Sequence, residues 1–210
     1  MIDVEIRLQE DVIAKIEKDL EGVENPRLAI KEVLNNTAKN ALDLIASQTK
    51  DVYSYRGNVK KSAKVQKATV KANETEIVFK SPVHEPRDFK VSPAQTANNI
   101  SKAKYTKTGK RTKGRTVKMK VLASSGMKPL EGSTGKAFIV QFKSGHVAVV
   151  SRDPQKKMKK NPKKAALRKI LSPSIPIMAG NEKVYDAKLS EIYEIMDQQT
   201  KAVISKILGG

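Results

Sequence analysis

Few residues in this chain are of the types that perform catalysis, and their spacing matches no common catalytic motif. The 210 residues include no Cys and only two His. The lack of Cys excludes a disulfide scaffold, a Cys-ligated zinc site and a thiol nucleophile. His84 and His146 have no carboxylate or Ser at a motif spacing, although a base in nucleophilic catalysis needs such a partner. We therefore expect no catalytic residues, no enzymatic activity, no metal and no cofactor.

One Gly-rich segment, residues 132–137 (GSTGKA), superficially resembles a phosphate-binding loop. The first Gly of that motif would fall at Leu130, and the Ser or Thr that should follow its Lys is Ala137. The pattern after the segment predicts a strand, whereas a phosphate loop leads into a helix. We interpret the segment as a turn that enters a strand.

Charge is the strongest chemical signal in the chain. Lys and Arg number 41 against 22 Asp and Glu, a net charge of +19. Residues 54–170 carry +24, whereas residues 1–53 carry −4 and residues 171–210 carry −1. Residues 102–120 contain nine Lys and Arg and residues 156–169 contain eight, with no acidic residue in either stretch. The residues that we expect to contact a partner or DNA are Lys110, Arg111, Lys113, Arg115, Lys156, Lys157, Lys159 and Lys160.

Composition alone leaves three interpretations of these basic stretches open. They could neutralise phosphates of a nucleic acid, bind acidic surfaces of partner proteins, or remain as solvated loops. Lys dominates over Arg and aromatic residues are few, which favours non-specific attraction over base-specific or single-strand binding. There is no run of about 18 apolar residues and no signal-peptide layout, so we expect a soluble intracellular protein with no membrane contact.

The ends of the chain have helical periodicity. Apolar residues recur every three to four positions between Pro26 and Ile45, with Asn25 as the expected N-cap. A shorter helix is predicted over residues 9–20 and a C-terminal helix over residues 183–208, which Gly209 would end.

The middle of the chain has strand patterns. Residues 64–71 and 74–80 predict a hairpin, residues 89–91 a short edge strand, and residues 116–122 a strand with alternating Val, Met and Lys. The strongest hairpin signal spans residues 138–150 and turns at Ser144-Gly145. We expect the residues of an assembly core to be Phe138, Val140 and Phe142 in this hairpin, and Ile175, Pro176 and Ile177 before the last helix. The edges of 64–71 and 116–122 could pair with a neighbouring subunit.

These patterns predict an α+β fold, with an antiparallel β-sheet packed against two or three helices and long basic loops or arms. No internal repeat and no clean domain boundary is visible, so we expect a single domain over residues 1–210. Its parts would be a helical segment 1–53, a β-rich basic middle 54–152 with an arm at 98–115, a basic loop 153–170 and the helix 183–208.

The order of several pieces resembles one protein family. A strand that opens with Ala-Phe-Ile at residues 137–139 leads through Ser-Gly into a strand ending at Arg152, and Pro-Ser-Ile-Pro at 173–176 precedes the last helix. Upstream, a basic segment at 56–61 (RGNVKK) precedes a Lys-Ala-Thr strand at 67–71. This order is similar to that of the phage minor tail protein Z family, the tail completion or neck proteins of long-tailed phages, over about residues 28–207.

The resemblance implies a structural virion protein with no catalytic residues. It implies a subunit that assembles as a homo-oligomeric ring, expected to be hexameric, which joins the tail to the head connector. The implied partners are the head–tail connector or stopper protein, the tail terminator and tail tube proteins, with non-specific contact to genome DNA as a further option. The implied location is the virion tail or neck, after assembly in the bacterial host cytoplasm.

Two functions from other classes remain as alternatives. A non-specific nucleic-acid-binding protein, ribosomal- or chromatin-like, would bind free DNA or RNA with steep salt dependence. A phosphodiester-cleaving enzyme is the weaker alternative, because the sequence offers no cluster of metal ligands.

Overall fold

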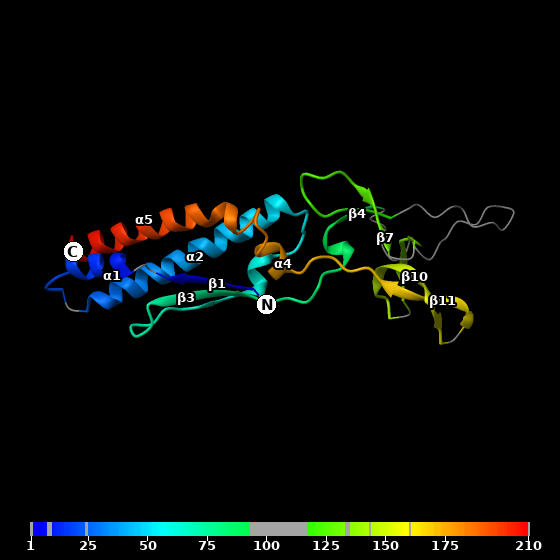
Figure 1. Cartoon of the computed structure of the whole chain (residues 1–210), viewed down its shortest axis with the longest axis horizontal. Coiled ribbons are helices and arrows are strands. Elements are labelled where there is room, and N and C mark those ends of the chain that lie inside the picture. The colour runs from blue at the N-terminus through cyan, green and yellow to red at the C-terminus, as the bar shows by residue number, and fades with distance from the viewer. Residues whose placement is uncertain are drawn as a thin grey trace. The chain divides into compact units, whose positions relative to one another are not determined.

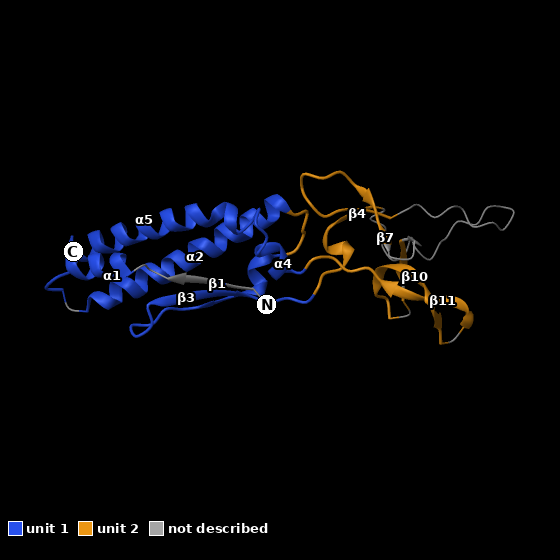
Figure 2. Cartoon of the chain, in the orientation of Figure 1, with its two compact units in different colours: residues 1–52, 58–82, 174–210 blue, residues 53–57, 83–173 orange. Residues whose placement is uncertain are grey.

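The computed structural model divides the chain into two compact units, which are coloured separately in Figure 2. It describes residues 2–7, 10–23, 25–92, 117–132, 135–142, 144–159 and 161–209. Unit 1 consists of residues 1–52, 58–82 and 174–210, and unit 2 of residues 53–57 and 83–173. The chain therefore enters and leaves unit 2 twice, which explains why no single boundary is visible in the sequence.

Unit 1 is built on two long helices that run side by side in Figure 1, α2 (Pro26–Val52) and α5 (Leu189–Leu208). The side chains of α2 that face the interior include four Ala, so the helices can approach closely. The salt bridge between Lys206 and Glu32, at 3.0 Å, joins the last turns of α5 to the start of α2. Helix α1 (Glu10–Asp19) packs on both with Ile16 buried, and Leu20, in the turn after it, is also buried.

A three-stranded antiparallel sheet completes unit 1, with β3 (Glu74–Phe79) between β1 (Ile2–Arg7) and β2 (Ala63–Gln66). On β3, Thr75, Ile77 and Phe79 are buried and alternate with less buried residues, which is the period expected for a strand with one face on helices. Helix α2 packs against all three strands. The short helix α4 (Ile175–Ala179) packs on α2, β1 and β3, and the 3-10 turns η1 (Val59–Ser62) and η3 (Asp186–Lys188) complete the unit.

Unit 2 is made of short antiparallel strands and one long hairpin. One sheet has the order β4 (Lys90–Ser92), β5 (Lys118–Lys120), β6 (Lys128–Pro129). A second has the order β11 (Asn161–Lys169), β10 (Val147–Met158), β9 (Phe138–Gln141). The strands β7 (Glu131–Gly132) and β8 (Gly135–Lys136) form a small ribbon, and the 3-10 turn η2 (Pro86–Asp88) packs on β10.

The core of unit 2 lies between these sheets. Val91, Val117, Ala137 and Val149 are buried together, with Leu130, Ile139 and Ile170 packed against them. Phe89 is fully buried as well and contacts the ring of Tyr55 at a centroid distance of 5.6 Å.

The α+β class is confirmed, and so are the three helices and the hairpin around Ser144-Gly145. Helix α5 begins at Leu189 rather than Lys183, because η3 precedes it. Asn25 has a left-handed φ of 66°, not the extended backbone usual for an N-cap. Strand β1 at the N-terminus was not expected from the sequence.

Two strand predictions were wrong. Residues 153–170, expected to be a loop, belong mostly to β10 and β11, because backbone pairing holds a strand even when none of its described side chains is buried. Residues 116–122 are not an edge, because β5 lies between β4 and β6; β2 is an edge strand of its own sheet. The arm expected at 98–115 lies outside the described residues.

Candidate contact surface of the basic unit

The β10–β11 hairpin has a buried root and an exposed tip. The first five residues of β10, Val147–Ser151, are all buried. From Arg152 to Lys169, by contrast, no described residue is buried. Strand pairing at the root continues as far as Asp153, which pairs with Ala166. The hairpin thus carries its outer half beyond the core of its own unit, where side chains can meet another molecule.

The outer half of the hairpin has an irregular register. Pairing shifts between Asp153 and Lys157, so that three residues of β10 have no partner across the ladder. Pro154 lies in this bulge and Pro162 lies at the start of β11. Proline has no amide hydrogen, and bulges and lysines on an edge prevent another strand from adding to it. This hairpin is therefore suited to contacts through side chains rather than to strand addition.

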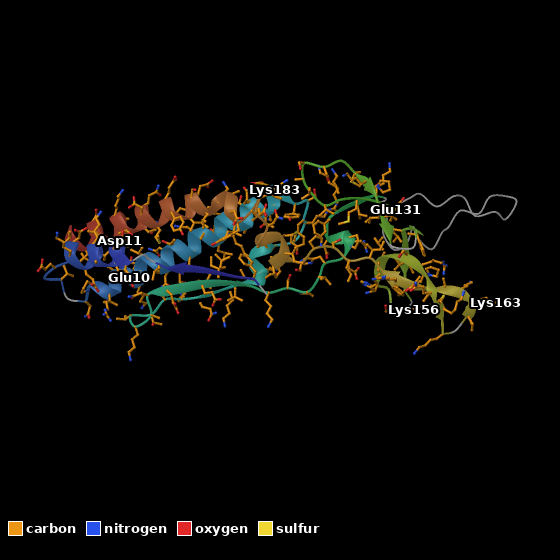
Figure 3. The ribbon with its side chains drawn as sticks, in the orientation of Figure 1. Glu10, Asp11, Glu131, Lys156, Lys163 and Lys183 are labelled. Carbon is orange, nitrogen blue, oxygen red and sulfur yellow. The ribbon has the colours of Figure 1, made fainter. Side chains whose placement is uncertain are left out.

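Positive charge covers the exposed part of the hairpin. The described basic side chains on it, all exposed, are Arg152, Lys156, Lys157, Lys159, Lys163, Lys164, Arg168 and Lys169. Figure 3 labels Lys156 on β10 and Lys163 on β11. Arg168 and Lys169 are consecutive residues in the regularly paired part of β11, and consecutive side chains of a strand point to opposite faces, so both faces carry positive charge. The single acidic residue, Asp153, accepts a hydrogen bond from the Gln155 backbone N–H at 3.1 Å.

A three-residue polar cluster anchors the root of the hairpin. Glu85 Oε1 lies 3.0 Å from His146 Nε2 and 3.3 Å from Lys169 Nζ, and these two nitrogens lie 3.4 Å apart. The His146 ring stacks on Phe142 with a centroid distance of 6.1 Å. One carboxylate thus joins the segment before η2 to β11 and to the residue that directly precedes β10.

The second histidine also has a carboxylate partner. His84 Nδ1 lies 3.3 Å from Asp88 Oδ2, which also accepts a hydrogen bond from the Glu85 backbone N–H at 3.0 Å. The ring of His84 contacts that of Tyr55 at a centroid distance of 4.7 Å. Burial, and secondarily the charge of Asp88, raises the pKa of Tyr55. These contacts hold a structural corner together rather than expose a reactive group.

Arg152 holds the hairpin at the point where it leaves the core. Its guanidinium lies 5.6 Å from the ring centroid of Phe138, and its Nη1 donates a hydrogen bond to the Ala165 carbonyl at 3.0 Å. A guanidinium over an aromatic face is favourable by about 0.5–1 kcal/mol when exposed. Arg152 thus joins β9, β10 and β11 and supports the orientation of the basic tip.

A second basic surface covers one face of the β4–β5–β6 sheet. The register pairs Lys90 with Lys120 and Ser92 with Lys118, whereas Val91 and Met119 are buried on the opposite face. Like charges directly across a strand pair destabilise it. None of the three strands contains an acidic residue. An anion on this face would relieve the repulsion.

The predicted contact residues are only partly described by the structure. Lys156, Lys157 and Lys159 lie exposed on the hairpin, while Lys110, Arg111, Lys113, Arg115 and Lys160 lie outside the described residues. The basic surface of β4 and β5 was missed, although the alternation of Lys with buried residues in 116–122 contains the signal.

The predicted assembly core needs correction. Phe138, Val140 and Phe142 are only half-buried, and it is Ile139, on the opposite face of β9, that packs against the core of unit 2. Ile175 is fully buried and Pro176 is buried in α4, but Ile177 is 57% exposed. Alternation alone does not tell which face of a half-buried strand points inward.

The carboxylate partners of the histidines were also missed. Asp88 follows His84 by four residues and could have been noticed in the sequence. Glu85 is 61 residues from His146, and no spacing rule connects them. Within the described residues there is no group of three His, Asp or Glu that could hold a metal ion.

Of the described helices, none is long and apolar enough to span a membrane. Comparison of the chain with protein-family models, with curated protein sequences and with solved structures found no match.

Proposed function

We propose that this protein is a structural subunit of the joint between the head and the tail of a long-tailed phage, assembling as a ring. The observation that carries the proposal is the exposed basic hairpin, whose root is anchored in a folded core and whose tip has no buried residue. A projection of this kind costs stability in an isolated domain, and its use is to contact another molecule. The resemblance of the motif order to tail completion proteins supplies the setting.

The division into two units also supports an assembly role. Unit 1 contains the long helices and a regular sheet, whereas unit 2 contains the projecting hairpin and the basic sheet face. A ring subunit needs two different surfaces that meet by rotation. Unit 1, with its large core, and unit 2, with its projecting hairpin, would supply two such different surfaces.

Ring formation by the purified full-length protein tests the proposal. We expect electron microscopy of negatively stained protein to show closed rings, and native mass spectrometry to show one defined oligomer. We also expect the protein to copurify with tail tubes from infected cells. A strictly monomeric protein that does not associate with tails would contradict the proposal.

A matched pair of variants separates a contact role of the hairpin from a general loss of charge. One variant replaces Lys156, Lys157 and Lys159 by Gln, and the control replaces Lys61, Lys67 and Lys71 of unit 1, which are equally exposed. We expect the hairpin variant to lower infectious titre or tail association, and the control to leave both unchanged. Tight binding to nucleic acid without rings or tail association would instead favour the ribosomal- or chromatin-like alternative.

A further inference from the structure

The charge of unit 2 cannot be neutralised inside the unit. It contains 24 Lys and Arg against four Asp and Glu. Three of those four acids are already engaged: Glu85 with His146 and Lys169, Asp88 with His84, and Asp153 with the Gln155 amide. The basic residues of unit 2 therefore outnumber its acidic residues six to one.

A second copy of the chain cannot supply the missing charge either. Unit 1 contains 17 Lys and Arg against 18 Asp and Glu, so it is almost neutral. Several of its carboxylates are also paired internally, such as Glu32 with Lys206 and Asp43 with Lys60. Each copy added to an oligomer adds +19, which makes close packing of copies less favourable. The net counter-charge therefore comes from outside the chain, either from small ions in solution or from an anionic partner.

From this charge distribution and the hairpin geometry we infer that unit 2 binds the phosphate backbone of double-stranded DNA, with the β10–β11 hairpin as the main contact. The inference rests on the proposed function, because it names a partner for the hairpin of the joint subunit. It also assigns a supporting role to Lys90, Lys118 and Lys120 on the β4–β5 face, where an anion would relieve the repulsion between paired lysines.

The residue types of the hairpin indicate which kind of nucleic acid it binds and which part of that nucleic acid it contacts. Residues 152–169 contain no aromatic side chain, and single-strand binding depends on stacking of bases on aromatic rings. Lys outnumbers Arg in the hairpin, and Lys acts as a point charge rather than a two-pronged donor to base edges. Binding through basic side chains on both faces of a hairpin is thus a contact to phosphates, independent of sequence.

The binding experiment uses the full-length protein and a fluorescein-labelled random duplex of about 30 base pairs, with anisotropy measured between about 50 and 200 mM salt. In the test variant, Lys156, Lys157, Lys159, Lys163 and Lys164 are replaced by Gln. In the control variant, the exposed unit 1 residues Lys15, Lys18, Lys61, Lys67 and Lys71 are replaced by Gln, so both lose five charges.

We expect the test variant to bind the duplex at least tenfold more weakly at about 50 mM salt, and the slope of log K against log salt to fall by about 4. The control should stay within about twofold of the unmodified protein, because its five lysines belong to unit 1, to which the inference assigns no DNA contact. An equal loss of duplex affinity in both variants would overturn the assignment of the DNA contact to the β10–β11 hairpin.

Competition with the labelled duplex distinguishes three classes of partner: double-stranded DNA, single-stranded nucleic acid and acidic protein. We expect polyglutamate and a single strand of equal charge to displace the duplex poorly. If polyglutamate competes as well as duplex DNA, the partner is an acidic protein and the inference is wrong; tighter binding of the single strand also overturns it. Rings without duplex binding would contradict this inference alone, whereas duplex binding without rings or tail association would contradict the proposed function alone.

Discussion

The two units of this chain differ both in the size of their buried core and in their net charge. Among the described residues, nine Phe, Leu, Ile and Met side chains of unit 1 are less than 2% exposed, whereas Phe89 is the single such side chain in unit 2. Unit 1 combines this large core with near-neutrality, whereas unit 2 combines a small core with 24 basic and four acidic residues. Self-repulsion destabilises a highly charged compact state. Unit 2 therefore has fewer buried contacts to stabilise it and more charge repulsion to destabilise it than unit 1.

The largest test of this comparison removes one buried Phe from each unit. Phe79→Ala in unit 1 and Phe89→Ala in unit 2 should each cost about 3–5 kcal/mol, since both rings are fully buried. Because unit 2 has far fewer large buried side chains, we expect Phe89→Ala to unfold it while unit 1 stays folded. Hydrogen exchange read by mass spectrometry reports each unit separately. Equal loss of protection in both units, for either variant, would show that they unfold as one.

A smaller loss of stability is expected when Ala replaces a glycine whose backbone is in the left-handed region, and each unit contains such a glycine. Gly22 in unit 1 has φ of 87° and Gly145 in unit 2 has φ of 82°, and neither has an atom within 4 Å of an added Cβ. Ala at either position should cost about 1–2 kcal/mol through backbone strain alone. Each change should lower hydrogen-exchange protection only in its own unit. Gly126→Ala is the control, because Gly126 has the same open space and no positive φ, and it should have no such cost.

The anchor of the hairpin gives a test at about 1 kcal/mol. Glu85→Gln removes the charge that holds both His146 and Lys169, and we expect it to destabilise unit 2 by that amount. In a double-mutant cycle with Lys169→Gln, the coupling should be about 0.5–1 kcal/mol, discounted because Lys169 is half exposed. Denaturant unfolding measures each corner of the cycle. Strictly additive effects would mean that the two side chains do not act together.

The smallest test is the alkaline stability of the two units. Burial raises the pKa of Tyr53 in unit 2 and of Tyr185 in unit 1. A raised folded-state pKa contributes stability that is full below the unfolded pKa, about 10, and is lost as pH rises through the folded value. Tyr53→Phe should therefore reduce the loss of unit 2 protection above pH about 10 without affecting unit 1. Tyr193→Phe is the control, because Tyr193 is half exposed. If Tyr53→Phe loses unit 2 protection above pH about 10 as much as the unmodified protein does, ionisation of Tyr53 is not the cause of that loss.

Helical periodicity was the most informative pattern in the sequence. The periodic apolar residues between Pro26 and Ile45 were predicted to share a face, and all but the partly buried Leu42 are buried in α2: Ile30, Val33, Leu34, Ala38, Ala41 and Ile45. Such a stripe persists through many turns, so a few exceptions do not hide it. In the C-terminal helix α5, whose existence was predicted, Ile192, Met196 and Val203 are buried, whereas Leu189 and Ile207 of the same apolar stripe are only partly buried.

Short strands and exposed strands were harder to predict. The outer half of β10 and β11 reads as a loop, because Pro, Asn and Lys dominate and no apolar alternation remains. Pairing there comes from the ladder that begins at the buried root, a contact between segments that local composition does not encode. Ile139 and Phe138 are both partly buried, and which of them packs against the core of unit 2 likewise depends on which face of β9 meets the other sheet.

The sequence by itself determined the helical ends, the central hairpin, the excess of positive charge and the lack of thiol chemistry, because each follows from residue type and local period. Only the tertiary structure decided that the chain forms two units, since each unit is built from segments that lie far apart in sequence. It also decided that residues 152–169 form a projecting hairpin, and that Glu85 holds His146 from 61 residues away. Those features depend on long-range backbone pairing and packing, which the order of residues specifies only through the complete fold.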